Sequence, residues 1–274
     1  MYKRQTQDPA FNSPKPVVSP KSPTPLPPYH WKKDPVDNRD FVYQLSSIPI
    51  MPPKVDLRPY ASPIDDQGNL SSCTGNAIAG AIDLIDRKNQ NKPLRVSRLF
   101  IYYQERLLEG TISQDRGAYI RDGIKACYTV GAPLESIWPY NISKFATNPS
   151  SVAYADAAKR KVVSYAKCGD FNAVKNALAA GTPIVVGFYV YSSFDTASVA
   201  KTGIMPYPNT TKEQLLGGHA VCLVGYDDTH NWFIARNSWG PNWGDHGYFY
   251  MPYQVIRDTN MSSDFWTINL VSNP

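Results

Sequence analysis

One cysteine of the chain lies where a thiol could act as a nucleophile. Cys73 follows the polar stretch QGNLSS and begins a run with helical spacing. A helix N-terminus favours a negative group, and the thiolate, not the thiol, is the nucleophilic form. Most free cysteines are small buried hydrophobes instead. The polar residues before Cys73 favour an exposed and reactive thiol.

Such a thiol needs a base, and four histidines are candidates. His30 lies in a proline-rich arm, while His230 and His246 lie in predicted turns. His219 opens a predicted strand in LGGHAVCLVGY, directly after Gly217 and Gly218. Paired glycines let another backbone approach closely. We therefore expect His219 to be the base.

A base of this kind is usually oriented by a third group. Asn237 ends a predicted strand in WFIARNSWGPNWG, and its amide oxygen can accept the imidazole N–H. Trp239 can shield that hydrogen bond from water. Each residue has a structural alternative, Asn237 as a turn residue and Trp239 as a core residue. The combination nevertheless predicts nucleophilic catalysis by Cys73, His219 and Asn237.

The secondary structure that must position these residues is predicted to change from helices to strands along the chain. Apolar residues recur at three- and four-residue spacing after Cys73, which predicts a helix there. Further helices are predicted at 97–108, 117–129 and 171–180, and strands at 184–190, 220–226, 232–236, 247–251 and 265–270. Helices come first and strands follow. This order predicts an α+β fold with segregated lobes.

The composition of the chain limits the classes of function that it can have. The 274 residues suffice for one large or two-lobed domain, and 42% are apolar. The net charge of +5 comes mostly from residues 1–34, which leaves the remainder close to neutral. A near-neutral body argues against a nucleic-acid surface. No apolar run reaches the length of a transmembrane helix, and the first ten residues lack a secretory signal.

The N-terminal fifth of the chain differs from the rest. Residues 9–28 are rich in proline and should be extended and mobile. Residues 31–45 mix aromatic and charged side chains, and we expect them to pack on the body. The folded domain should start near Val55. We therefore divide the chain into an extension at 1–50 and a domain at 51–274.

The four cysteines, Cys73, Cys127, Cys168 and Cys222, are far apart and match no zinc pattern. They imply no disulfide framework. If Cys73 is a free thiol, at most one disulfide can form among the others. This count suits a reducing compartment, and we expect no metal or cofactor.

The order Gln67, Cys73, His219, Asn237 resembles the papain family of cysteine peptidases. Supporting motifs are Gln67-Gly68 before the cysteine, Gly218-His219-Ala220-Val221, and Asn237-Ser238-Trp239-Gly240 followed by WG and GY pairs. The sequences VDLR at 55–58 and WPY at 138–140 also have counterparts. The resemblance spans roughly residues 52–270.

This resemblance implies a two-lobed fold with a helical lobe at about 67–165, an antiparallel β lobe at about 166–274, and the active-site cleft between them. It implies that Cys73 is a thiolate nucleophile paired with the His219 imidazolium. Gln67 and the Cys73 backbone N–H would form the oxyanion hole. Gly117 would pair with the substrate backbone. Gly218 and the strand near Val186 would line the pocket for the second residue before the cut.

The sequence also departs from the family pattern. Leu70 occupies the place of a cysteine that usually forms a disulfide, and Thr74-Gly75 follow the nucleophile in place of a small residue and tryptophan. Gly218 replaces a residue that is often polar in plant and animal members. These features favour a microbial or viral branch. The usual long helical propeptide is missing, and we expect a monomer.

Three questions stay open from the sequence. The segment at 29–50 either restrains the cleft or packs on the back of the domain. The thioester chemistry would serve a cysteine endopeptidase, but an acyl transferase or deamidase, or a peptide-binding protein without activity, is an alternative. The segment 191–216 is a candidate for the cleft-blocking loop of an exopeptidase, although an ordinary surface loop is the simpler interpretation.

The compartment is predicted indirectly. Asn69, inside the loop before Cys73, fits the N-glycosylation pattern with Leu70 and Ser71, as do Asn141, Asn209 and Asn260 with their own following residues. A glycan on Asn69 would obstruct the site. We therefore expect a reducing compartment or non-classical delivery and not a eukaryotic secretory route.

Overall fold

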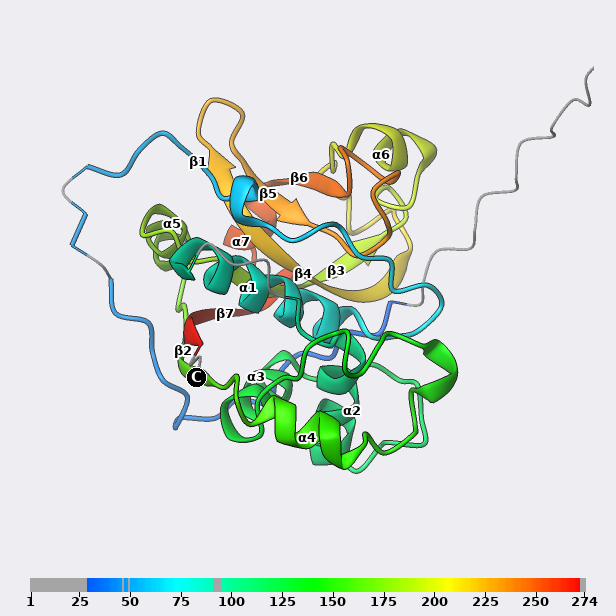
Figure 1. The fold of residues 1–274 in the computed structure, drawn as a ribbon. Coiled ribbons are helices and arrows are strands. Elements are labelled where there is room, and N and C mark those ends of the chain that lie inside the picture. Colours follow the sequence, from blue (N-terminus) through cyan, green and yellow to red (C-terminus); the bar gives the residue numbers. More distant parts are fainter. Residues whose placement is uncertain (1–28, 46, 49, 91–94, 272–274) are drawn as a thin grey trace, which may run out of the picture.

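The computed structural model describes residues 29–45, 47–48, 50–90 and 95–271 (Figure 1). The proline-rich segment 9–28 lies outside the described residues. The helices are α1 (Cys73–Gln90), α2 (Arg98–Leu108), α3 (Ile120–Thr129), α4 (Ser151–Ala157), α5 (Phe171–Ala179), α6 (Ala197–Thr202) and α7 (Tyr253–Arg257), with short 3-10 turns at Arg58–Tyr60 and Ile142–Lys144.

The strands form one antiparallel sheet. They are β1 (Lys54–Asp56), β2 (Val162–Lys167), β3 (Ile184–Tyr191), β4 (Leu215–Asp227), β5 (Trp232–Arg236), β6 (Tyr248–Pro252) and β7 (Ser262–Val271). The order across the sheet is β2-β7-β3-β4-β5-β6, and β1 pairs with β4. The predicted lobe boundary at 165/166 falls inside β2, which belongs to the sheet.

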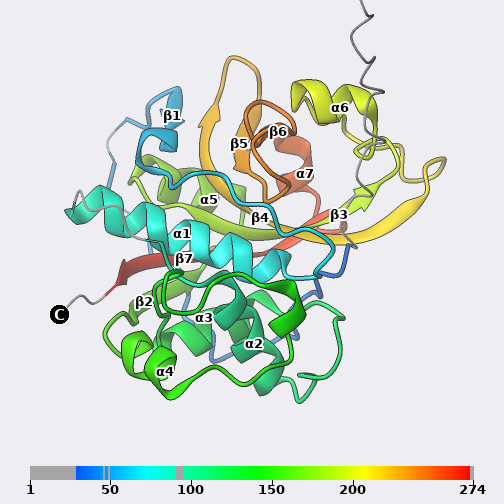
Figure 2. The same cartoon turned by 45° about the vertical axis from the view of Figure 1, so that its right-hand side comes forward.

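Helix α1 lies between the two parts of the molecule. It packs against β4 on one side and against α2 and α3 on the other (Figures 1 and 2). Every residue from Cys73 to Asp86 is buried. A helix covered on two sides is apolar around much of its circumference, which explains the dense apolar spacing after Cys73.

The core has two parts. The larger one joins α1 to the inner face of the sheet, and its members include Ile78, Ile82, Val186 and Val224. The smaller one lies within the helical part, around Leu99, Phe100 and Tyr102. The fold is therefore the predicted two-lobed α+β arrangement, with α1 belonging to both lobes.

Several boundaries differ from the prediction. Helix α3 begins at Ile120 and not at 117, because Gly117 has a φ of +67° that a helix does not tolerate. Strand β4 begins at Leu215, so His219 lies within a strand and does not open one. The segment 191–216 contains α6 and the start of β4.

The N-terminal segment crosses the molecule before the first strand. In Figure 1 it runs in blue from the boundary between the helical part and the sheet, past β2, and on to β1. Residues 29–34, called the strap below, lie between Gly218 of β4 and Tyr119 before α3, with isolated β-bridges to both. Trp31 of the strap belongs to the main core.

Candidate active site

Cys73 is the first residue of α1 and is fully buried. Burial raises the pKa of its thiol to about 12, although the neighbouring backbone amide of Ala220 favours the charged form. The removal of water from around the Cys73 thiol opposes its ionisation more strongly than the nearby backbone amides favour it. In this structure the thiol is therefore neutral.

His219 is brought to the site by the pairing of β4 with β5. Its Nε2 lies 2.8 Å from the Asn237 side-chain oxygen, just beyond the end of β5. Because an amide oxygen only accepts, Nε2 carries the hydrogen, which leaves Nδ1 as the nitrogen for proton exchange. This geometry brings His219 and Asn237 together, as the sequence predicts.

Aromatic rings surround the imidazole. Trp239 stacks on His219 at 4.8 Å between ring centroids and an interplanar angle of 24°, while Phe188 and Tyr29 approach its ring at steeper angles. Burial in these surroundings lowers the pKa of His219 to about 4, against the opposing effect of Asn237. The imidazole is therefore neutral, and the expected thiolate–imidazolium pair is not the favoured form while the site is covered.

Gln67 is fully buried beside the nucleophile loop. Its Oε1 accepts from the Ser238 hydroxyl at 2.6 Å, and its Nε2 donates to the Leu70 carbonyl at 2.9 Å. An amide nitrogen has two hydrogens, so one donor stays available. Sequence reasoning missed the part played by Ser238, although it lies inside the Asn237-Ser238-Trp239 motif.

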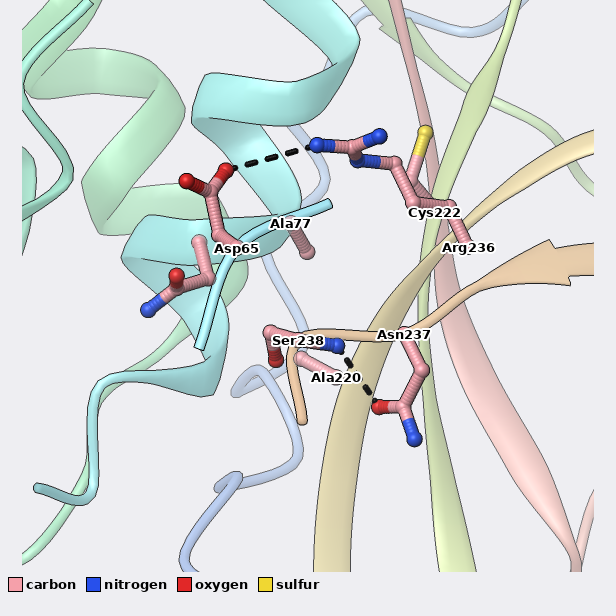
Figure 3. A pocket seen from close by; sticks show the side chains of 8 residues that line it. Asp65, Ala77, Ala220, Cys222, Arg236, Asn237 and Ser238 are labelled. Atoms are coloured by element: carbon pink, nitrogen blue, oxygen red, sulfur yellow. Dashed lines mark hydrogen bonds and ion pairs between the residues drawn. The ribbon is translucent and has the colours of Figure 1, made fainter. Parts of the chain in front are cut away.

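The small cavity behind these residues is structural. It has a volume of about 10 Å³, enough for one water molecule at most. Figure 3 shows Asn237, Ser238 and Ala220 on one side of it, with the Asp65–Arg236 ion pair on the other. Arg236 also donates to the carbonyls of Ser62 and Pro63. This network holds the chain before α1 against β5.

The strap lies over the candidate site. The Trp31 backbone N–H donates to the Gly218 carbonyl at 2.8 Å, and the Lys32 backbone N–H donates to the Ala118 carbonyl at 3.3 Å. His30 Nδ1 is 2.8 Å from the Ser71 hydroxyl. The strap is thus hydrogen-bonded to β4 on one side and to the segments before α1 and α3 on the other, next to the candidate nucleophile and the candidate base.

Two glycines that the sequence singled out lie against the strap. A Cβ on Gly117 would be 1.7 Å from the His30 carbonyl oxygen, and one on Gly218 would be 2.6 Å from the Trp31 carbonyl oxygen. The close backbone approach predicted from the glycine pair is therefore made by the chain itself.

Side chains fasten the strap at its C-terminal end. Lys32 Nζ lies 2.7 Å from a Glu109 carboxylate oxygen. Asp34, 5% exposed, receives a hydrogen bond from the Trp266 indole, and its own N–H donates to Asp264 at 2.8 Å. Sequence reasoning did not select the partners Glu109, Trp266 and Asp264, because they lie more than seventy positions from the strap.

The other cysteines take no part in this site. Cys127, Cys168 and Cys222 are buried and form no disulfide with one another or with Cys73. Within the described ranges, no three His, Cys, Asp or Glu side chains are grouped so as to hold a metal ion. No helix in the described part of the chain has the length and apolar character needed to cross a bilayer.

Comparisons with known proteins show the family that the chain matches. The family described as Papain family cysteine protease matches residues 51–267. An uncharacterized peptidase C1-like protein of Acanthamoeba polyphaga mimivirus is 45% identical over 81% of this chain and 74% of its own length. A cathepsin B-like protein of Giardia intestinalis is 29% identical over 77% and 70%, respectively.

Solved structures give the same result. Xylellain, a cysteine protease from Xylella fastidiosa, superposes with a TM-score of 0.83 at 39% identity, over 90% of this chain and 96% of that one. Procathepsin L 3 of Tenebrio molitor, at a TM-score of 0.64 and 20% identity over 83% and 74%, shares the fold. The viral and bacterial relatives agree with the branch expected from the sequence.

Proposed function

We propose that this protein, which belongs to the papain family of cysteine proteases and is a cysteine endopeptidase, attacks peptide carbonyls with Cys73. His219 Nδ1 takes the thiol proton and returns it to the leaving amine. Asn237 keeps the other ring nitrogen protonated and oriented. Water then hydrolyses the thioester and releases a free carboxylate.

The charge that develops on the carbonyl oxygen needs donors. Gln67 has an unused Nε2 hydrogen, and the Cys73 backbone N–H at the start of α1 has no partner within the helix. We assign both to the oxyanion hole, where one donor contributes about 2.7–4 kcal/mol to transition-state stabilisation. Ser238 orients the Gln67 amide and is therefore a positioning residue.

The chain as folded is a restrained form of this enzyme. The observation that carries this proposal is the strap, which is hydrogen-bonded to Gly218 on one wall and to Ala118 on the other. A substrate backbone cannot use these carbonyls while Trp31 and Lys32 occupy them. By removing water, the strap also favours the neutral thiol and imidazole over the reactive ion pair.

Displacing the strap should therefore release activity. Trp31→Ala removes the largest strap side chain in the core, and we expect the full-length variant to cut peptides about tenfold faster or more. Phe41→Ala is the matched control, because Phe41 lies on the same segment beyond the strap and is exposed. Cys73→Ala is the blank.

The readout is mass spectrometry of a peptide mixture. Cys73-dependent products with free carboxylate ends support the endopeptidase. New amide or ester ends would indicate the acyl transferase alternative, and the absence of products from folded Trp31→Ala would contradict the assigned chemistry. Neither a transferase nor an inactive peptide-binding protein has a specific observation in its favour.

We also propose a monomer that works in a reducing compartment or is delivered by a non-classical route. All four cysteines are free thiols in the described structure. Asn69 is exposed in the loop between Gln67 and Cys73, so a glycan there would lie beside the cleft. An active species that carries a glycan on Asn69 would contradict this proposal.

A further inference from the structure

Residues 67–73, called the oxyanion loop below, carry both proposed oxyanion donors. The Gln67 side chain lies at one end of the loop, and the Cys73 backbone N–H lies at the other. Leu70 stands where, by resemblance to the family, a disulfide-forming cysteine is usual, and all four cysteines of this chain are free thiols. Donors of this kind act because they are held in place before the reaction. In this chain, noncovalent contacts must hold them.

One of these contacts is apolar. Leu70 is buried in the smaller core of the helical part, and Tyr140 packs against the same core. The burial of Leu70 fixes the middle of the oxyanion loop, because moving the side chain out would expose it to water. It does not orient the polar groups at the two ends, which depend on hydrogen bonds.

The hydroxyl of Tyr140 joins the two ends of the oxyanion loop. It donates to the Gln67 backbone carbonyl at 2.9 Å and lies 2.6 Å from the hydroxyl of Ser72, which directly precedes Cys73. A carbonyl oxygen only accepts, so the single hydrogen of Tyr140 goes to Gln67. The Ser72 hydroxyl is therefore the donor to Tyr140. One oxygen atom thus connects both ends of the loop.

Residues behind the loop fix the direction of these bonds. Asn76 Nδ2 donates to the Ser72 hydroxyl oxygen at 3.0 Å, and Asn76 Oδ1 accepts from Arg98 Nη1 at 3.0 Å. The bonds run in one direction, from Arg98 through Asn76, Ser72 and Tyr140 to the Gln67 carbonyl. Each bond in such a chain polarises the next. Ser72 and Asn76 are buried, so water does not compete for their hydrogen bonds.

Tyr140 is itself held from two directions. Its backbone N–H donates to a Glu135 carboxylate oxygen at 2.9 Å, and the Arg98 guanidinium lies over its ring at 3.9 Å from the centroid. A buried cation over an aromatic ring is attracted more strongly than an exposed one, and Arg98 is only 8% exposed. Burial raises the pKa of the Tyr140 hydroxyl to about 12, so the hydroxyl keeps its hydrogen near neutral pH.

Gln67 is bonded to both parts of the molecule. Its backbone N–H donates to the Ser238 carbonyl at 2.8 Å, and its side-chain oxygen accepts from the Ser238 hydroxyl. Ser238 follows β5 of the sheet, whereas Tyr140 belongs to the helical part. Because the candidate site lies where these two parts meet, bonds to both keep the Gln67 amide in place.

Resting on the function proposed above, we propose that Tyr140 is a positioning residue of the oxyanion hole: its hydroxyl holds Gln67 where the carbonyl oxygen of the substrate gains charge. Tyr140 does not take part in the proposed chemistry and acts through Gln67. This charge develops only in the transition state, so the loss of Tyr140 should appear in kcat and not in KM. A merely structural role would lower stability without this separation.

The first experiment removes only the hydroxyl. Tyr140→Phe is introduced into full-length protein carrying Trp31→Ala, and peptide turnover is measured. A longer bond from the Leu70 backbone N–H to the Gln67 carbonyl, at 3.4 Å, remains in the variant. The donor is therefore displaced and not lost. We expect kcat to fall roughly tenfold, with KM changed by less than about twofold.

Tyr226→Phe in the same background is the matched control. The Tyr226 hydroxyl also donates to a backbone carbonyl, that of Pro52, at 2.7 Å. Its loss removes a hydrogen bond of the same kind outside the site and should leave kcat unchanged. If Tyr140→Phe lowers kcat less than about twofold, or lowers it no more than Tyr226→Phe does, the proposal is overturned.

A double-mutant cycle tests whether Tyr140 acts through Gln67. In Gln67→Ala the donor that Tyr140 positions is absent, so the addition of Tyr140→Phe should lower kcat by less than about threefold more. Residues in one hydrogen-bond network show such non-additive effects, whereas independent sites add. An equal loss with and without Gln67→Ala would contradict positioning and leave the peptidase assignment standing.

A measurement without catalysis separates this proposal from the proposed function. If Trp31→Ala shows no Cys73-dependent turnover, the proposed function fails, and hydrogen exchange of the backbone amides at 68–72 tests Tyr140 instead. In full-length Tyr140→Phe these amides should exchange at least about tenfold faster than in Tyr226→Phe. Unchanged exchange overturns the positioning role.

Ser72→Ala replaces Tyr140→Phe in both measurements if the latter does not fold. It removes the donor to Tyr140 but leaves the bond from Tyr140 to Gln67, so the expected loss in kcat and the expected gain in exchange are about threefold. No change in either measurement would overturn the proposal.

Discussion

Two groups of polar side chains are buried beside the strap, and they are stabilised in different ways. In the proposed catalytic group, called the catalytic group below, hydrogen bonds join neutral donors and acceptors of His219, Asn237, Gln67 and Ser238. In the anchor group, the Asp34 backbone N–H donates to an Asp264 carboxylate oxygen, which brings the two acidic residues close together. Donors and acceptors are complementary in the first group, whereas the second group brings two acidic side chains together.

Burial favours the neutral form in both groups. It lowers the pKa of His219 to about 4 and raises that of Asp34 to about 7, with Asp264 adding to the effect on Asp34. The pKa of Asp264 is raised as well, because burial outweighs its hydrogen bond and its nearby lysine. Burial therefore favours the uncharged form of both aspartic acids and of the histidine.

The two groups differ in how they exchange protons with solvent. If the open enzyme has a thiolate–imidazolium pair and the closed one a thiol and an imidazole, a proton only moves from His219 to Cys73. Closing the strap over the catalytic group then takes up no proton. Asp34 does take up a proton when the strap closes. The closing equilibrium therefore depends on pH through the anchor group.

The largest effect expected from this comparison is on the catalytic group. Gln67→Ala removes the proposed oxyanion donor, and we expect kcat to fall by about 10²–10³-fold. The measurement is peptide turnover in full-length protein carrying Trp31→Ala, so that restraint does not hide the loss. Gln44→Ala is the control, because Gln44 is exposed. A loss of less than about tenfold would contradict a role of Gln67 in the oxyanion hole.

The second expectation concerns pH. The pKa of Asp34 is raised from 3.8 to about 7 in the closed form, so the closed form binds an additional proton between about pH 4 and pH 7. Its stabilising effect is complete below pH 4 and is lost as pH rises to 7. Cys73 should therefore become more accessible to iodoacetamide over this range, by at least about tenfold.

Asp34→Asn is the matched variant, because it resembles the protonated acid. The ratio of Cys73 labelling in the parent to that in Asp34→Asn cancels the intrinsic pH dependence of the thiol. This ratio should rise to about pH 7 and then level off. The other charged groups near Asp34 are Asp264, Lys33, Lys167, Arg121 and Asp40. A constant ratio would show that one of them, and not Asp34, dominates.

The smallest effect is expected from the outer contact of the strap. Lys32 Nζ lies 2.7 Å from Glu109, but the lysine side chain is 31% exposed. Partly exposed ion pairs contribute little to stability, so Lys32→Met should raise Cys73 labelling less than about fivefold. Arg39→Met, in the exposed pair with Asp37, is the control. An effect as large as that of Trp31→Ala would mean that charge, and not shape, holds the strap.

Local patterns were sufficient for much of the fold. The helix that starts at Cys73 and the strands near 184–190 and 232–236 were predicted closely, because each has dense apolar spacing. Strands β1 and β2 were missed. β1 has only three residues, and the register of β2 against β7 is irregular. Short or bulged strands have little periodicity to detect.

The sequence by itself was sufficient to propose which residues form the site and what chemistry they would do. Cys73, His219, Asn237 and Gln67 are residue types with few other reasons to occur in that order, and each lies in a short motif that is readable locally. The protonation of Cys73 and His219 was not predictable, since it follows from burial among residues distant in sequence and not from sequence neighbours.

Only the tertiary structure decided what covers the site. The aromatic and charged residues at 29–34 are equally compatible with the cleft and with the back of the domain. The choice follows from contacts over long sequence separations, such as Trp31 against Gly187 and Asp34 against Asp264. Such contacts depend on shape complementarity between distant segments, which exists only once the sheet and α1 have folded together.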